Sequence, residues 1–585
     1  MESEQRRKRR RLLNKPTADS FYFTVRSLTV CFSFFIFLLF ISSDRFSIST
    51  GSFRPVLTVP ASFLPTRLGL TRDSFDTRSL PLVVEDRVLF PDHVLLIVSN
   101  KVLHSSQNLE CVYYNLFSSE DLVLRPVISV DDYHGDKSVI RCPIPPTNCS
   151  ASVNLRWYWE AAQGGAAAVK TAAVASWDRV VYEAVLDWNS AVVFVKGLNL
   201  RPHKESDPTQ FRCHFGLSKF DKDEGFVFST DAVAAAQEVI RCLLPRSIQN
   251  NPGKAQGIRV TVSHVDARED GVDRPLPSVA KVYSAKSYDD KRSNKGKYEL
   301  CACTMMWNQA SFLREWIAYH AWLGVERWFI YDNNSDDGIQ EVIDELNLEN
   351  YNVSRHSWPW IKAQEAGFSH CAMQARSECK WLGFFDVDEF FYFPRHRGQD
   401  MQGQNSLKTL VANYSDSPTY AEIRTICHSF GPSGLTAAPS QGVTVGYTCR
   451  LQAPERHKSI VHLEKLDTTL LNVVHHFKLK EGYRYLNLPE STGIVNHYKY
   501  QVWDSFKAKF FRRVSTYVAN WQEDQNQGSK DRAPGLGTVA VEPPDWRLRF
   551  CEVWDTGLKD FVLANFADTT TGYLPWQRSS FIKKS

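Results

Sequence analysis

The chain has 585 residues, 43% of them hydrophobic and 23% charged, with a formal net charge of +4. This length exceeds one ordinary domain, and the composition is that of a globular protein with a sizeable core. The small net charge lacks the basic signal of nucleic-acid-binding proteins, so we expect no nucleic-acid partner.

The N-terminal segment predicts a single transmembrane helix of type II orientation. Residues 1–20 form a basic tail, and residues 21–41 are apolar except for Arg26. A helix of about 20 apolar residues crosses a bilayer. The basic flank precedes the span, which predicts a cytosolic N-terminus and a lumenal remainder. The alternative is a cleavable signal peptide, but no small-x-small cleavage site follows the apolar run.

The next two segments differ sharply in composition. Residues 42–88 are rich in Ser, Thr, Pro and Arg and indicate a stem. Residues 89–285 contain short apolar and β-branched runs separated by turn residues. This pattern predicts an antiparallel β-sandwich domain.

A weak internal repeat supports the β prediction. Cys111 precedes Cys142 by 31 residues, Cys213 precedes Cys242 by 29, and both second cysteines end the same Val-Ile-Arg-Cys sequence. We expect two similar β segments, each closed by its own disulfide.

Three tryptophans of this region are candidates for glycan binding. Aromatic faces stack on the C–H faces of sugars, so Trp157, Trp159 and Trp177 could make the region a carbohydrate-binding module. The alternative is that they are core and edge aromatics of the sandwich.

Residues 297–585 alternate predicted strands and helices, which indicates an α/β domain. Tyr298–Met306 and 325–331 are the first two predicted strands, and helices follow from Ser311 and Ile339. Polar groups at the carboxyl ends of such strands face the usual ligand crevice. Neither a Gly-x-Gly-x-x-Gly motif nor a P-loop is present, which disfavours a dinucleotide fold and a P-loop enzyme.

Asp332 directly follows the second of these strands. Its carboxylate could bind the ribose or base of a nucleotide. Residues 332–338 could equally be only the capped start of the following helix, because Asp, Asn and Ser are good caps.

Two aspartates follow a later buried strand. Residues 366–380 are predicted as a helix, residues 381–385 as a strand, and Asp386 and Asp388 come next. In an extended chain their carboxylates point to the same side and repel each other unless a cation joins them. Mn²⁺, with Mg²⁺ as the alternative, would bind these oxygens together with a diphosphate. The opposing interpretation is a solvated turn.

The C-terminal part supplies further polar candidates. Lys458 could hold a phosphate, and a neutral His497 could complete the metal site, although a single histidine is more often structural. Glu455, Glu389 and Glu490 are alternative candidates for the catalytic base.

An ordered set of motifs resembles glycosyltransferase family 92, and within it the plant β-1,4-galactan synthases. The set comprises residues 308–320, 331–337, 385–390, 430–434 and 496–498, and the resemblance covers about residues 297–530. It implies a GT-A fold, a UDP-galactose donor, Mn²⁺ and inversion at the anomeric carbon. It also implies elongation of β-1,4-galactan side chains of pectic rhamnogalacturonan I in the Golgi.

The resemblance also implies roles for individual residues. His497 becomes a third metal ligand beside Asp386 and Asp388. The donor-binding residues would be Asn308, Glu315, Asp332, Asn333, Asp337, Asp386 and Lys458.

Several alternatives stay open. The chain could be a lectin-like protein with Ca²⁺ at the aspartates, a metal-dependent hydrolase, or a transferase that uses another UDP-sugar. A homodimer is also left open. The nucleotide-binding pattern before the two aspartates argues against the lectin and the hydrolase.

Overall fold

The computed structural model describes residues 82–99, 101–102, 108–117, 122–159, 173–198, 204–217, 226–265, 274–284, 296–394, 403–473, 475–509 and 542–577. All of them belong to one compact unit, Thr66–Ser585. The predicted tail (1–20), the predicted membrane span (21–41) and residues 42–81 of the predicted stem lie outside the described residues. None of the helices in the described ranges has the length and apolarity that a bilayer crossing requires.

Strands β1 to β16, within residues 84–284, form what we call the β region. Its first part, residues 84–176, contains two sheets. The five-stranded sheet has the order β5-β6-β2-β1-β8, and the three-stranded sheet has the order β4-β3-β7. Their bounds are β1 Val84–Leu89, β2 His93–Val98, β3 Leu109–Tyr114, β4 Leu122–Pro126, β5 Ser129–Tyr133, β6 Lys137–Pro143, β7 Asn154–Trp157 and β8 Ala175–Ser176. Leu96, Tyr113 and Ile140 share one buried core, and the Cys111–Cys142 disulfide joins β3 to β6.

The second part of the β region forms an eight-stranded sheet. Its order is β15-β12-β13-β14-β10-β9-β16, with β11 paired to β13. The bounds are β9 Val180–Asp187, β10 Ser190–Lys196, β11 Glu205–Ser206, β12 Phe211–Leu217, β13 Phe226–Ala236, β14 Val239–Leu243, β15 Val260–His264 and β16 Tyr283–Ser284, with helix α3 at Arg246–Gln249. The Cys213–Cys242 disulfide joins β12 to β14. Both disulfides predicted from the repeat are therefore confirmed.

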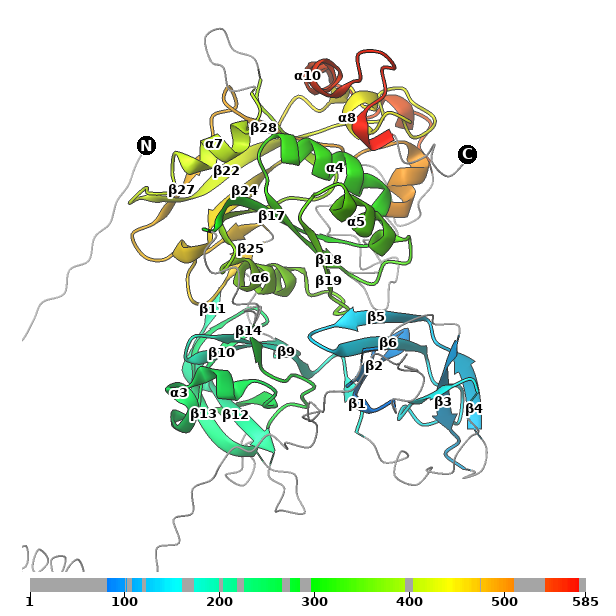
Figure 1. The fold of residues 1–585 in the computed structure, drawn as a ribbon, viewed down its shortest axis with the longest axis vertical. Helices are drawn as coiled ribbons and strands as arrows, with labels where there is room; N and C mark the ends of the chain where they lie inside the picture. The colour runs from blue at the N-terminus through cyan, green and yellow to red at the C-terminus, as the bar shows by residue number, and fades with distance from the viewer. Residues whose placement is uncertain are drawn as a thin grey trace, which may run out of the picture. The chain divides into compact units, whose positions relative to one another are not determined.

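The α/β domain is built on a nine-stranded sheet of order β19-β18-β17-β20-β24-β22-β28-β21, with β27 paired to β22 (Figure 1). The bounds are β17 Tyr298–Met306, β18 Arg327–Asp332, β19 Val353–Ser357, β20 Cys379–Phe384, β21 Glu389–Tyr392, β22 Tyr420–Ser429, β24 Arg456–His462, β27 Arg484–Asn487 and β28 Ile494–His497. Strands β19, β18, β17 and β20 are parallel, and β20 meets β24 antiparallel.

The other elements of this domain are shorter or lie outside the sheet. They are helices α4 Ala310–Trp322, α5 Ile339–Leu348, α6 Gln364–Ala375, α7 Ser406–Ala412, α8 Val443–Gly446 and α10 Gly557–Phe566, and strands β23 Cys449–Arg450, β25 Asn472–Val473, β26 His476–Phe477 and β29 Val553–Trp554. The predicted strand Tyr298–Met306 is confirmed. The helix predicted over 366–380 ends at Ala375 instead, because Cys379 already pairs with Tyr298 as the start of β20.

Strand β17 separates two cores by the alternation of its side chains. Leu300 and Ala302 join the core that contains α4 and α5. Cys301 and Cys303 join a second core that contains α6. That second core also includes Trp177 and other side chains of the β region. Successive residues of a strand face opposite sides of the sheet, so one strand ties both cores together.

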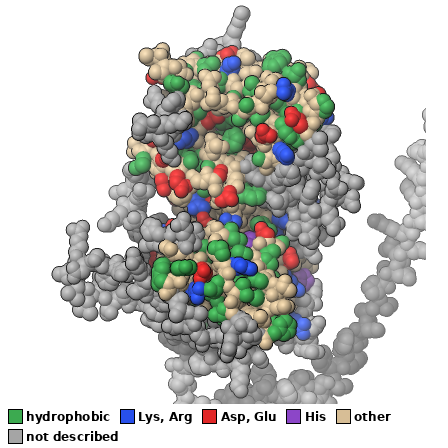
Figure 2. Space-filling model, turned by 90° about the vertical axis from the view of Figure 1, so that its right-hand side faces the viewer, with side chains coloured by type: hydrophobic (Ala, Val, Ile, Leu, Met, Phe, Trp, Pro, Cys, Tyr) green, Lys and Arg blue, Asp and Glu red, His purple; other side chains and the backbone are tan. Residues whose placement is uncertain are grey.

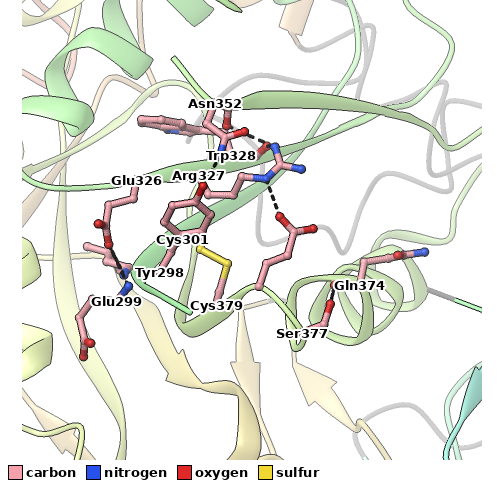
Figure 3. The surroundings of a disulfide bond; sticks show 12 residues. Tyr298, Glu299, Cys301, Glu326, Arg327, Trp328, Asn352, Gln374, Ser377 and Cys379 are labelled. Atoms are coloured by element: carbon pink, nitrogen blue, oxygen red, sulfur yellow. Dashed lines mark hydrogen bonds and ion pairs between the residues drawn. A yellow bond between two sulfur atoms is a disulfide. The ribbon is translucent and has the colours of Figure 1, made fainter. Parts of the chain in front are cut away.

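Disulfides bind β17 to its neighbours. Cys301 is linked to Cys379 of β20, and Cys303 to Cys371 of α6. Beside the first disulfide, Arg327 donates from Nε to Glu378 (3.0 Å) and from Nη1 to the Asn352 carbonyl (3.2 Å) (Figure 3). These links fix β20, the strand that leads into the two aspartates.

Candidate active site

Asp386 and Asp388 lie in a turn between β20 and β21, not in the extended segment assumed from the sequence. The Glu389 N–H donates to the Asp386 carbonyl (3.0 Å). The Glu389 carboxylate accepts in return from the Asp386 N–H (2.9 Å). Strand β21 then pairs antiparallel with β28, and this register places His497 opposite Glu389. His497, more than a hundred positions away in the sequence, thus reaches the turn of Asp386, Asp388 and Glu389, which we call the acidic turn.

A cavity of about 200 Å³ lies at this turn. Asp386, Asp388 and His497 all line it. The remaining lining residues are Met305, Met306, Trp307, Gln309, Asn333, Trp360, Lys362, Ala363, Gln364, Glu365, Lys499 and Lys509. On the face drawn in Figure 2, acidic and basic side chains are interspersed over the described surface, in keeping with the small net charge.

Two lysines neutralise the acidic turn. Lys458 is 5% exposed as a residue, and its ammonium lies 3.1 Å from Asp386 Oδ2 and 2.8 Å from Glu389 Oε1. Lys509 forms an ion pair with Asp388. Lys458 comes from β24 and therefore reaches the turn from the neighbouring strand.

Burial and these charges set the protonation of the turn. Burial raises the pKa of Asp386, but the attraction of Lys458 and the smaller contributions of His475 and His497 together outweigh burial and lower that pKa to about 2. Burial raises the pKa of Glu389 to about 8, with Asp386 and Asp388 adding to the rise and Lys458 opposing it. Burial lowers the pKa of His497 to about 4. At neutral pH the site therefore holds charged Asp386 and a neutral imidazole.

The donor set fits a divalent cation. Asp388, Glu389 and His497 each offer one ligating atom, and these atoms lie within 4.8 Å of one another. The His497 Nε2 atom is 3.7 Å from Asp388 Oδ2. Carboxylate oxygens with a neutral imidazole nitrogen suit Mn²⁺ and similar ions. Asp386 borders the same cavity through its partly exposed carboxylate, whereas Glu389 does not line it. The cavity therefore favours Asp386, Asp388 and His497 as the ligand set.

Asn333 is the predicted donor-binding residue that reaches the cavity along with Asp386. It also holds the cavity wall, because its Nδ2 donates to the carbonyls of Trp358 (2.6 Å) and Trp360 (3.2 Å). Asp332 is 1% exposed, and its carboxylate accepts two hydrogen bonds from Arg355 (2.9 and 2.6 Å). Lys458 stands behind the acidic turn and is not among the lining residues.

The other predicted donor residues hold the scaffold around the cavity. The Asp337 carboxylate accepts from the Ala310 N–H (2.7 Å) at the start of α4. The buried Glu315 carboxylate accepts from the N–H groups of Val443 (2.8 Å) and Thr444 (3.0 Å) at α8. Asn308 Nδ2 donates to Asp336 (2.6 Å). In this structure Asn308, Glu315, Asp332 and Asp337 do not line the cavity.

None of the three predicted base candidates lines the cavity. Glu389 is buried in the acidic turn, and Glu455 pairs with Lys499 (3.0 Å). Glu490 Oε1 lies 2.5 Å from His428 Nε2, within hydrogen-bond distance. A carboxylate that sequence reasoning missed does line the cavity: Glu365 in the first turn of α6. No local motif marks it, since only the fold brings that turn to the cavity.

The three candidate glycan-binding tryptophans have different environments. Trp177 is 3% exposed and stacks on Phe90 and Trp360, which leaves its ring to the core. Trp157 stacks on Trp159 with ring centroids 5.1 Å apart, and Trp159 is 53% exposed. Of the three, Trp159 presents the most surface to solvent.

Comparison with known proteins identifies the family. Residues 296–532 match the description glycosyltransferase family 92. A glycosyltransferase family 92 protein of Ricinus communis is 81% identical over 581 residues, which cover 99% of this chain and 100% of that protein. The chain belongs to glycosyltransferase family 92. It is therefore a glycosyltransferase, and the cavity with its acidic turn is the best candidate for the active site.

More distant relatives match a smaller part of the chain. A galactan β-1,4-galactosyltransferase of Arabidopsis thaliana is 26% identical over 226 residues, which cover 34% of this chain and 43% of that protein. A solved structure of GalNAc-T7 with UDP, GalNAc and Mn²⁺ is similar to this chain over a region that covers 39% of this chain and 53% of the GalNAc-T7 chain. Its sequence identity is 12% and its TM-score 0.22, too low to carry an argument.

We expect Lys458→Met to destabilise the protein by about 1–3 kcal/mol, because it leaves the partly exposed Asp386 carboxylate without its counter-charge. Since the pKa of Asp386 lies near 2 instead of 3.8, the contribution of its ion pair is present above pH 3.8 and fades as the pH falls toward 2. Thermal unfolding of the variant at neutral pH measures the loss.

Lys408→Met is the matched control, because Lys408 forms a more exposed ion pair with Glu326 (2.7 Å). Its loss should cost less than about 1 kcal/mol. Equal melting temperatures for the two variants would contradict the structural role of Lys458.

Proposed function

We propose that this glycosyltransferase transfers galactose from UDP-galactose to the 4-hydroxyl of terminal galactose in β-1,4-galactan, with inversion and with Mn²⁺. The geometry that supports a nucleotide-sugar enzyme best is the convergence of Asp386, Asp388 and His497 on one cavity. The galactan acceptor is supported by the similarity to the Arabidopsis galactosyltransferase and by the motif resemblance. The α/β domain would then be a GT-A domain.

The proposal includes a cellular location. The basic tail and apolar residues 21–41 favour a type II anchor in the Golgi membrane, with the catalytic domain in the lumen. The disulfides among the described residues are compatible with an oxidising compartment.

The residues of the cavity would divide the work of transfer. Asp386, Asp388 and His497 would hold the divalent cation, which supplies charge stabilisation for the leaving diphosphate when it is bound. Lys458 keeps Asp386 ionised and in place. Lys499 and Lys509 line the same cavity and present positive charge to an anionic substrate.

A carboxylate must accept the proton of the attacking hydroxyl. Among the candidates, Glu365 is the one that lines the cavity, so we assign the base to Glu365. Glu455 stays the alternative, because it contacts the cavity-lining Lys499. Glu389 suits this role poorly, since its carboxyl group already binds Asp386 N–H and Lys458.

The β region would contribute to holding the polymer. The stacked pair Trp157 and Trp159 carries exposed aromatic surface, and such surface binds sugar rings. Trp177 would take no part in this contact because it is buried.

Asp386→Asn and Asp388→Asn should each abolish transfer, because each removes a charged ligand of the cation. The measurement is incorporation of radiolabel from UDP-galactose into galacto-oligosaccharides by the full-length protein in detergent, with and without Mn²⁺.

The control is Asp344→Asn, which changes an exposed aspartate on α5 and should leave transfer unchanged. Full Mn²⁺-dependent activity in the Asp386 or Asp388 variant would reject the assignment of the metal site. Transfer from a different UDP-sugar would keep the site and correct the donor.

Glu365→Gln should lower the rate of transfer by about 10²- to 10⁴-fold, the usual contribution of a general base. Binding of UDP should stay unchanged, because the variant keeps the shape of the side chain. Glu455→Gln provides the comparison: a large loss of rate there, with Glu365→Gln active, would move the base to Glu455.

A further inference from the structure

Residues 358–363, between β19 and α6, form a wall of the cavity that is separate from the acidic turn. Trp360, Lys362 and Ala363 of this segment line the cavity. The Trp358 N–H donates to the Asp332 carbonyl (2.9 Å), and Trp358 Nε1 donates to the Ala363 carbonyl (3.2 Å). Together with the two hydrogen bonds from Asn333, these contacts give the wall a fixed conformation.

Lys362 has an unusual backbone and an unused charge. Its φ of 54° lies in the left-handed region, which non-glycine residues seldom adopt and which is often found at binding sites. Its side chain is half-buried. Within the described ranges of the chain, no hydrogen bond or ion pair engages its ammonium group. An ammonium group that lies at a cavity without a hydrogen-bonding partner can bind an anion.

The β region holds Lys362 in this conformation. Lys196, the last residue of β10, donates from Nζ to the Lys362 carbonyl (2.8 Å). Lys196 is itself fixed by an ion pair with Glu238. Close by, Trp360 Nε1 donates to the buried carboxylate of Glu183 on β9 (3.0 Å). Two neighbouring strands of the β region therefore support the wall from behind.

We propose that Lys362 binds an anionic oxygen of the substrate and that Lys196 is the positioning residue that presents it to the cavity. This inference rests on the proposed function, since it requires a substrate that enters this cavity. It assigns to the β region a part in substrate binding that is separate from any contact with the polymer.

Two substrates could supply the anion. The diphosphate of the sugar nucleotide carries it in the donor, and the carboxylate of a uronic acid would carry it in the acceptor. Burial and the nearby Lys196 lower the pKa of Lys362, while Asp178 raises it. A bound anion would offset the repulsion between the two lysines.

The test compares Lys362→Met and Lys196→Met with Lys254→Met, a control at an exposed lysine of the β region. The full-length protein in detergent is titrated with UDP in the presence of Mn²⁺ by calorimetry. Transfer is measured with neutral galacto-oligosaccharides and with oligosaccharides that contain galacturonic acid. Thermal unfolding confirms that each variant is folded.

We expect Lys362→Met to weaken one of these interactions by about tenfold, as loss of a charge-assisted hydrogen bond does. Weaker UDP binding identifies the donor diphosphate as the source of the anion. A raised KM for the carboxylated acceptor alone identifies the acceptor. Lys196→Met should move the same constant in the same direction with kcat little changed, and Lys196→Arg should restore it because arginine can also donate to the carbonyl.

Two results would overturn the inference, and only the second would also overturn the proposed function. If Lys362→Met stays within twofold of Lys254→Met for every probe while Asp386→Asn is inactive, Lys362 binds no anion and the proposed function stands. If the unsubstituted protein neither binds UDP with Mn²⁺ nor transfers sugar from any UDP-sugar, the proposed function fails and the inference fails with it.

Discussion

The candidate active site depends on the compensation of charge in one buried turn. Asp386, Asp388 and Glu389 bring three carboxyl groups together, and two of them are almost fully buried. Such groups cannot all be ionised in a medium of low polarity unless cations join them. Lys458 from β24 and His497 from β28 are brought to the turn by strand pairing. The antiparallel pairing of β20 with β24 and of β21 with β28 therefore brings together the same charged side chains that the proposed chemistry would use.

The β region and the α/β domain are linked through the cavity wall. Trp177 of the β region and Trp360 of the wall stack in one core. Lys196 and Glu183 add hydrogen bonds to the same wall. A change in the core of the β region would reach the cavity through these contacts, so the region is part of the structure that shapes the site.

The sequence predicted the features that depend on local pattern. The strand at Tyr298–Met306 is an apolar run with clear ends, and the two β disulfides follow from a repeat. The acidic turn also lies at a cavity, as its position after a buried strand suggested. Family membership is likewise confirmed by close relatives. The donor, the acceptor and the membrane anchor stay proposals.

Features that depend on distant partners could not be predicted. Asp332 follows a strand as a ligand-binding residue would, yet Arg355 takes its carboxylate. Glu315 stands in a family motif, yet it holds the start of α8. Glu365 and Lys362 carry no motif, because only the packing of the segment before α6 brings them to the cavity. The partners of Asp332, Glu315 and Lys362 lie more than twenty residues away along the chain, and no sequence spacing reveals them.

Diffraction from crystals grown with UDP and Mn²⁺ tests the central claim most directly, because manganese is located by its anomalous signal. The account predicts a manganese peak within ligand distance of Asp386, Asp388 and His497, with the diphosphate of UDP bound to the same ion. A peak elsewhere, or UDP bound away from these side chains, would contradict it.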